Sequence, residues 1–203
     1  MKTHNPGHPT HQALVDTVVD LLKTKKLGEI TSEDVLNHSG ISKGSLYHHF
    51  EDFSDLLEEG EIKRFANTID GILNWVIEAL GETDKEMFLQ KLESYNRITA
   101  SREFYPQRLV RVKAATHAGL GARMKTRFEI EQERLTGGLA DMIQECQFRG
   151  WVSLRFQPRT LAVFIQAYSL GQIVNDYALV QVESEDWLAL VNTVLREVVM
   201  GKD

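Results

Sequence analysis

The segment that most constrains this chain runs from Gly40 to Phe50 and reads Gly-Ile-Ser-Lys-Gly-Ser-Leu-Tyr-His-His-Phe. Helix-start signals stand on both sides of its turn glycine, with Thr31 upstream and Ser42 downstream. Two short helices joined by a glycine turn form a helix-turn-helix, whose second helix can enter the major groove of DNA. The segment therefore predicts a DNA-reading unit close to the N-terminus.

The second helix of this pair is expected to have one buried side and one exposed side. Leu46 and Phe50 stand four residues apart, so they share a face that should pack against neighbouring helices. Gly44 weakens the helix by about 1 kcal/mol, but it allows another backbone to approach closely. The predicted DNA-binding residues are Thr31, Ser42, Lys43, Gly44, Ser45, Tyr47, His48 and His49, of which Thr31 and His49 are expected nearer the phosphate backbone.

From about His11 to Leu57 the chain resembles the TetR family of one-component transcriptional regulators. The resemblance rests on an amphipathic first helix, on the segment from Thr31 to Ser39, and on the string Ser-Lys-Gly-Ser-Leu-Tyr-His-His-Phe. It implies an all-α fold of about nine helices, with a three-helix DNA-binding domain over residues 1–55 and an effector-binding and dimerisation bundle over residues 56–203. It also implies a dimeric regulator, a repressor that a small, largely apolar ligand releases from a palindromic double-stranded DNA operator.

The charge of the chain fits a DNA partner only when it is considered locally. The net charge is −6, yet residues 1–50 carry five Lys or Arg against five Asp or Glu, so the other 153 residues carry 18 against 24. Six of the seven histidines also lie in the first 50 residues, and their partial protonation would make that end mildly positive. Phosphate contacts depend on local charge, so we expect strongly salt-sensitive binding through few ion contacts.

The sequence carries no enzyme, membrane or metal motif. It lacks the Gly-x-Ser-x-Gly, His-Glu-x-x-His and Walker patterns, so we expect neither catalysis nor a cofactor. No run of 18 apolar residues predicts a membrane span, and the polar N-terminus does not read as a signal peptide. Cys146 is the only cysteine, which favours the reducing cytoplasm. His4, His8 and His11 have no cysteine or carboxylate neighbours in sequence, so we expect no metal site there.

Beyond the DNA-reading unit the sequence predicts helices only. The first helix of the chain is expected from Pro9 to Lys26, and glycine and proline punctuation predicts later helices at about 52–80, 84–101, 103–118, 121–149, 157–181 and 184–200. Pockets between bundle helices are a common ligand location. The candidate ligand-binding residues are Trp75, Tyr95, Phe104, His117, Phe128, Gln166 and Asn175, although plain core packing is the alternative for each of them.

The last two predicted helices carry more apolar surface than a thin bundle can cover. The segment 157–181 is apolar almost all round, and 184–200 carries a broad apolar stripe. The predicted dimer-interface residues are Phe164, Tyr168, Trp187, Val191, Val194 and Val198. A two-fold dimer would place its two recognition helices about 34–36 Å apart, which suits a palindromic operator. The alternative is that both stripes form the core of a monomer.

Two other functions remain open on the sequence alone. A constitutive DNA-binding protein would need the helix-turn-helix but no effector pocket. A helical protein that only binds other proteins would account for the long helices. It would not explain the two capped short helices around Gly40 or the exposed polar edge of the second one. The sequence therefore favours a ligand-responsive DNA-binding regulator.

Overall fold

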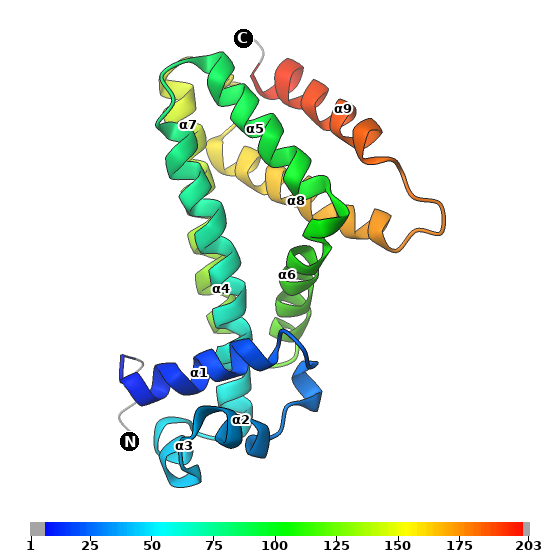
Figure 1. Ribbon diagram of the computed structural model, residues 1–203. Helices are drawn as coiled ribbons and strands as arrows, with labels where there is room; N and C mark the ends of the chain where they lie inside the picture. Colours follow the sequence, from blue (N-terminus) through cyan, green and yellow to red (C-terminus); the bar gives the residue numbers. More distant parts are fainter. Residues whose placement is uncertain (1–6, 201–203) are drawn as a thin grey trace.

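The computed structural model describes residues 7–200, and this part of the chain is helical throughout, with no strand (Figure 1). The all-α prediction is therefore confirmed. The helices are α1 Pro9–Leu21, α2 Ser32–Ser39, α3 Lys43–His49, α4 Phe53–Leu80, α5 Lys85–Ala100, α6 Tyr105–Ala118, α7 Ala122–Phe148, α8 Pro158–Asp176 and α9 Ser184–Val194, with 3₁₀ turns at Leu27–Glu29 and Arg102–Phe104 and a π-type turn at Leu195–Val199. Within the described residues, no helix has a stretch both long and apolar enough to cross a bilayer.

Two long helices, α4 and α7, pack side by side and form the stem of the molecule (Figure 1). At the lower end of the stem in this view, α1 crosses α4, while α2 and α3 lie beneath it. At the upper end α5, α8 and α9 pack together, and α6 connects the two ends beside the stem. The structure thus separates the helix-turn-helix from the larger bundle while a single helix, α4, belongs to both.

Two distinct hydrophobic clusters account for this arrangement. The smaller cluster consists of Leu14, Val15, Val18, Leu22, Ile30, Val35, Leu46, Phe50 and Leu56. The larger cluster begins with Phe65 and Ile69 and continues through the buried residues of the bundle as far as Met200. The single helix α4 supplies Leu56 to the smaller cluster and Phe65 to the larger one. Because α4 is unbroken, it fixes the position of one cluster relative to the other.

The first helix is shorter than its sequence predicted, since α1 ends at Leu21 and not at Lys26. The chain turns there, so that Ile30 becomes buried in the smaller cluster and Leu27 packs against it. A helix as far as Lys26 would have placed Lys25 in its last turn. Lys25 instead lies in the connection after α1, where its Nζ atom is 2.6 Å from Oδ1 of Asp34. Tertiary packing of two apolar residues therefore overrides the helical periodicity.

Two further boundaries differ from the sequence prediction. Helix α8 ends at Asp176 rather than near residue 181, because the side chain of Asn175 binds the backbone of Val182. Its Oδ1 accepts from the Val182 N–H at 2.7 Å, and its Nδ2 donates to the Val182 carbonyl at 3.0 Å. Helix α9 leaves α-helical geometry after Val194 and finishes in the π-type turn.

Gly60 sets the distance between α1 and α4. A Cβ atom at this position would lie 2.3 Å from Cγ1 and 2.6 Å from Cβ of Val18, which is itself completely buried. The Cβ of a valine cannot swing aside by a rotamer change, so relief would require movement of the helix backbone. Gly71, in the same helix, would place its Cβ in open space.

We therefore predict opposite effects for two glycine substitutions in α4. Gly60→Ala should lower the free energy of unfolding by about 1–3 kcal/mol, because it overpacks the contact with Val18. Gly71→Ala should leave stability unchanged or raise it by up to about 1 kcal/mol through helix propensity. Urea denaturation of both variants checks this, and an equal effect of the two substitutions would contradict it.

Candidate DNA-binding interface and effector cavity

Capping interactions fix the two short helices of the DNA-reading unit. The Thr31 hydroxyl accepts from the Asp34 N–H at 3.1 Å, and the Asp34 carboxylate accepts from the Thr31 N–H at 2.9 Å. A hydrogen bond from Lys25, together with those from Thr31, lowers the pKa of Asp34 to about 2. Gly40 follows α2 at φ 68°, in the left-handed region that glycine adopts most readily. The Ser42 hydroxyl then caps α3 by accepting from the Ser45 N–H at 3.2 Å.

The buried side of α3 is the one that its sequence predicted. Leu46 and Phe50 have no exposed surface, and both belong to the smaller cluster. Six of the predicted DNA-binding residues are exposed: Thr31 at the start of α2, and Ser42, Lys43, Gly44, Tyr47 and His48 at α3. Tyr47 is 36% exposed and Ser45 is half-buried. A Cβ at Gly44 would meet no atom within 4 Å. The α3 backbone is therefore uncovered at this position, and another molecule can approach it closely.

His49 occupies a different environment from its neighbour His48. It is half-buried, and its ring centroid lies 4.7 Å from that of His8, whose side chain caps α1. His11, in α1, stacks on the ring of Phe50 at 4.5 Å. These ring contacts hold α3 against the start of α1, so His49 positions the exposed residues of α3.

Within the described residues, no group of histidine, cysteine and acidic side chains has a metal-binding arrangement, and His4 lies outside them.

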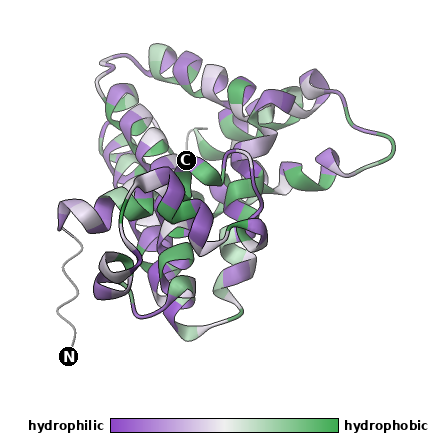
Figure 2. Cartoon of the chain, turned by 60° about the horizontal axis from the view of Figure 1, so that its bottom comes forward, coloured by the Kyte–Doolittle hydropathy of each residue, from purple (hydrophilic) through white to green (hydrophobic). Residues whose placement is uncertain are grey.

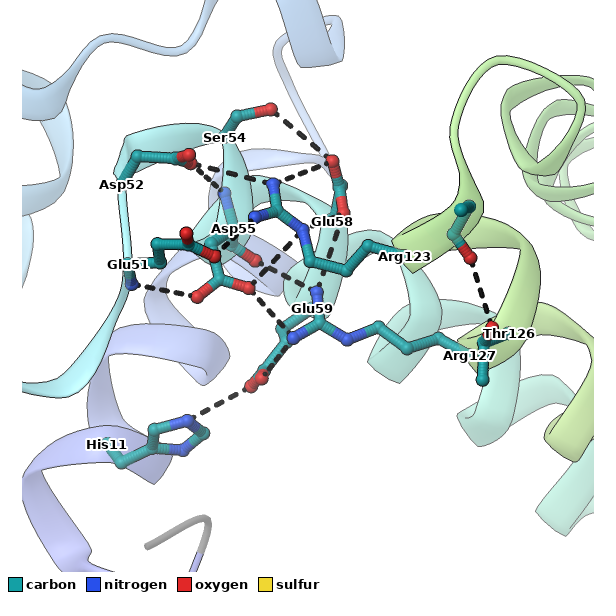
Figure 3. Close-up of polar contacts among 11 residues, drawn as sticks. His11, Glu51, Asp52, Ser54, Asp55, Glu58, Glu59, Arg123, Thr126 and Arg127 are labelled. Atoms are coloured by element: carbon teal, nitrogen blue, oxygen red, sulfur yellow. Dashed lines mark hydrogen bonds and ion pairs between the residues drawn. The ribbon is translucent and has the colours of Figure 1, made fainter. Parts of the chain in front are cut away.

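An ion-pair network joins the DNA-reading end to α7, and Figure 3 draws its contacts. Arg127 reaches from α7 to the N-terminal part of α4, where its Nη2 lies 2.8 Å from Oδ1 of Asp55 and 2.7 Å from Oε1 of Glu59. Arg123, one turn earlier in α7, binds both carboxylate oxygens of Glu58 at 2.7 and 3.0 Å. Glu59 also lies 3.1 Å from Nε2 of His11, which extends the network to α1.

Asp55 is the most deeply buried acid of this network, with 4% of its surface exposed. Burial by itself would raise the pKa of its carboxyl group. Hydrogen bonds from the Glu51 N–H and from Arg127, together with the charges of Arg127 and Arg123, outweigh that effect and lower the pKa. The ionised form of Asp55 is therefore the one that the folded chain stabilises.

Among the cavities that border α6, three share a lining residue of this helix. The largest, of about 550 Å³, opens between α1, α4 and α6. A second, of about 270 Å³, lies among α4, α6, α7 and α8, and a small inner cavity of about 40 Å³ lies beneath Trp75 and Tyr95. The largest cavity falls within the range of about 300–1,000 Å³ that is usual for small-molecule sites.

Five of the seven candidate ligand-binding residues line these cavities: Trp75, Tyr95, Phe104, Phe128 and Gln166. The rings of Trp75 and Tyr95 stack with centroids 4.4 Å apart. The other two lie outside these three cavities, and His117 lines a separate one of about 310 Å³ together with Glu61 and Arg64. His117 binds Glu61 of α4, with its Nδ1 atom 2.7 and 2.8 Å from the two carboxylate oxygens, and Asn175 closes the loop after α8.

Sequence reasoning missed Arg111, which lines all three cavities. An arginine within a polar helical segment reads as a surface residue, because its burial arises only when four helices pack around it. Its one sequence signal is the four-residue spacing from Gln107 and Ala115, both of which also line cavities. Periodicity can suggest such a face but cannot tell which side of α6 is inside.

The predicted interface residues gather on one face of α8 and α9. Phe164, Tyr168, Trp187, Val191 and Val194 line a shared hollow of about 120 Å³, together with Leu190. Val191 is already buried in the chain, whereas Phe164 and Leu190 are exposed. The side chain of Val198 lies outside the described part of the structure.

The loop between α8 and α9 continues this apolar surface. It projects from the bundle and is drawn partly in green in Figure 2, where green marks hydrophobic residues. Its exposed apolar side chains are Leu179, Val180 and Val182, and the end of α8 adds Val174 and Tyr177. An apolar surface of this extent is typical of a protein contact.

Comparison with solved structures finds the same fold in proteins described as transcriptional regulators. No family model matches the chain, and no curated protein matches its sequence. A TetR-family transcriptional regulator from Agrobacterium tumefaciens superposes with a TM-score of 0.64 at 14% identity, covering 93% of this chain and 98% of that one. GusR of Salmonella enterica gives a TM-score of 0.68 at 15% identity, covering 96% and 99%.

A third similar structure comes from Saccharomonospora viridis and was solved in complex with choline. Its TM-score is 0.67 at 16% identity, and the match covers 93% of this chain and 96% of that chain. The chain therefore has the helical fold of the TetR-type regulators over nearly its whole length. At these identities the likeness defines the fold, and the function has to be argued from the chain's own residues.

We predict that the contact between α7 and Asp55 contributes to stability in a pH-dependent way. Arg127→Met should lower the free energy of unfolding at pH 7 by about 1–3 kcal/mol, because it leaves a buried carboxylate short of hydrogen bonds. Since the folded pKa of Asp55 lies below its unfolded value of 3.8, its stabilisation is present above that pH and is lost as the pH falls further. Denaturation from pH 7 to pH 3 checks this.

Lys125→Met is the matched control for this prediction. Lys125 lies in the same helix and is exposed, and its Nζ atom lies 3.6 Å from Oε1 of the equally exposed Glu129. Its substitution should change stability by no more than about 0.5 kcal/mol at any pH. If Arg127→Met behaved like this control, the network would have no part in holding α7 to α4.

Proposed function

We propose that the chain is a dimeric, non-enzymatic DNA-binding transcriptional regulator of the TetR type. The observation that carries the proposal is the exposed polar edge of α3. Lys43, Gly44 and His48 are exposed opposite the fully buried Leu46 and Phe50, on a helix whose ends are capped. This is the arrangement that lets the start of a recognition helix meet base edges while its other side stays packed. A cytoplasmic location accompanies this function.

A homodimer formed through α8 and α9 is part of the proposal. The support is the continuous apolar face that includes Phe164 and Leu190 and the projecting loop with Leu179. Such a surface costs free energy when it faces water, at about 25 cal/mol per Å². A two-fold pair would bury it on both copies and would present two recognition helices to the two halves of a palindrome.

Release from the operator by a small ligand is the third part of the proposal. The largest cavity is lined by Val19 and Lys23 of α1 as well as by residues of α4 and α6, so a bound molecule would touch the DNA-reading end directly. The contact between His117 and Glu61 also joins α6 to α4. A ligand that prefers the non-binding arrangement by about 1.4–2.8 kcal/mol would weaken DNA binding tenfold to a hundredfold. This linkage supports a repressor.

DNA binding can be tested at single residues. An operator is first selected from a random duplex library, and binding is then measured by fluorescence anisotropy over a range of salt concentrations. Tyr47→Ala should cost about 1–3 kcal/mol of operator binding if Tyr47 contacts a base. Lys43→Ala should reduce the slope of log affinity against log salt by about 1, because one phosphate contact is lost.

Lys125→Ala, which removes an exposed lysine of α7 outside the predicted DNA-binding residues, is the control and should leave both affinity and slope unchanged. Wild-type affinity and salt dependence in all three variants, with intact helical content, would remove α3 as the DNA-binding helix. A helical interaction protein would then be the better description of the chain.

The dimer can be tested by placing a charge on the exposed apolar face. Phe164→Glu should convert the dimer to a monomer at micromolar concentration, because an unpaired carboxylate buried at the interface is costly. Leu120→Glu, at an exposed apolar position between α6 and α7, should leave the dimer intact. Sedimentation velocity of the two variants and the wild type decides this, and a monomeric wild type would contradict the proposed interface.

A further inference from the structure

Arg111 is buried, and its side chain lacks an acid partner among the residues that the structure describes. It is 9% exposed, and within residues 7–200 nothing accepts a hydrogen bond from its Nε atom. No carboxylate of the described chain forms an ion pair with its guanidinium group either, whereas the nearby Arg108 forms two hydrogen bonds with Asp176, at 2.6 and 2.7 Å. Burial lowers the pKa of Arg111. A desolvated cation without a counter-charge is expensive, so its retention requires a reason.

The position of Arg111 supplies that reason. It is the one described residue that lines all three converging cavities, at the point where α6 faces α4, α5 and α8. Its guanidinium group therefore borders the space that a bound molecule would fill. This placement distinguishes it from an arginine that stabilises the fold through a packed ion pair.

The rest of the cavity lining has no negative charge. Its charged residues are Lys23, Arg64 and Arg111, and no aspartate or glutamate is among them. Lys23 binds Asp20 at 2.6 Å and Arg64 donates to the Leu22 carbonyl at 2.9 Å, so both have partners within the chain. Among the described lining residues, Arg111 is the cation that is buried and whose Nε atom has no hydrogen-bond partner, so it is the one placed to receive a counter-charge from a ligand.

We propose that the effector is a small amphipathic carboxylate whose carboxylate group pairs with Arg111. A planar carboxylate matches the guanidinium fork and can accept two hydrogen bonds from it, and its single charge balances the single buried cation. The apolar body of the ligand would lie against Ile72, Trp75 and Tyr95. This inference rests on the proposed ligand-responsive function and adds the chemical class of the ligand.

Tyr95 supplies a second recognition group. It lies close enough to Arg111 to interact with it electrostatically, and it lines both the inner and the largest cavity. Burial raises the pKa of Tyr95 to about 12, so its hydroxyl group is protonated at neutral pH and can donate to a ligand oxygen. A cation such as choline, which the Saccharomonospora viridis protein binds, would be repelled by Arg111.

The test compares carboxylates with their uncharged amides. The probes are 4-phenylbutyrate and decanoate, their primary amides, and choline, titrated by calorimetry into the full-length wild type, into Arg111→Met and into the control Arg159→Met, which removes an exposed arginine that pairs with Glu133. The wild type and Arg159→Met should bind at least one carboxylate at least tenfold more tightly than its amide, and should not bind choline. Arg111→Met should lose that preference, and Arg111→Lys should retain part of it because the charge is kept.

A second measurement separates ligand recognition from a structural role. Without ligand, Arg111→Met should melt at the same temperature as the wild type or higher, because it removes an uncompensated buried charge. A lower melting temperature in both Arg111→Met and Arg111→Lys would overturn the proposal, since it would show that Arg111 supports the fold. Equal binding of carboxylate and amide, or no binding of either carboxylate to the wild type, would overturn it as well.

Operator release then distinguishes this inference from the function on which it rests. Release of operator DNA by the carboxylates, measured by anisotropy, would support both. If the amides or choline released DNA and the carboxylates did not, regulation by a ligand would stand and the role of Arg111 would fail. If the carboxylates bound through Arg111 but left operator affinity unchanged, the anion site would stand and release by this ligand class would fail.

Discussion

The continuity of α4 is the constraint on which the rest of the structure depends. This helix buries Leu56 in the cluster that supports the DNA-reading unit and Phe65 in the cluster that forms the bundle. Arg123 and Arg127 then fasten α7 to its N-terminal part through Glu58, Asp55 and Glu59. Because a helix transmits displacement along its axis as a rigid element, any tilt that the bundle imposes on α4 must reach α3.

The chemistry of α6 complements this mechanical link. Arg111 faces the cavities on one side of α6, and His117, further along the same helix, binds Glu61 of α4. A molecule that engages Arg111 would therefore act on a helix that is already joined to the stem. The largest cavity also reaches α1, which packs on α4 through the close contact at Gly60. Binding energy in the cavity thus has two short physical routes to the DNA-reading end.

The candidate sites differ in how far the sequence could predict them. The edge of α3 proposed to contact DNA follows from local rules, since capping at Thr31 and Ser42 and the four-residue spacing of Leu46 and Phe50 define it without distant contacts. The cavity does not follow from such rules. Four of the five predicted residues that line the cavities are aromatic, and the fifth is Gln166. The polar candidates His117 and Asn175 instead hold a helix contact and a loop, because a polar side chain pairs with whichever partner the fold brings to it.

The sequence by itself determined the helical class, the helix-turn-helix and the side of α3 that is exposed, because these depend on periodicities and caps within a few residues. Only the tertiary structure decided that α1 ends at Leu21, because Leu27 and Ile30 pack against the smaller cluster, and that the Nε atom of the buried Arg111 has no hydrogen-bond partner among residues 7–200. Both outcomes depend on contacts between residues far apart in the chain. The spacing of residues within a segment does not tell which distant part of the chain will pack against it. That packing decides where a helix ends and whether a charged side chain has a partner.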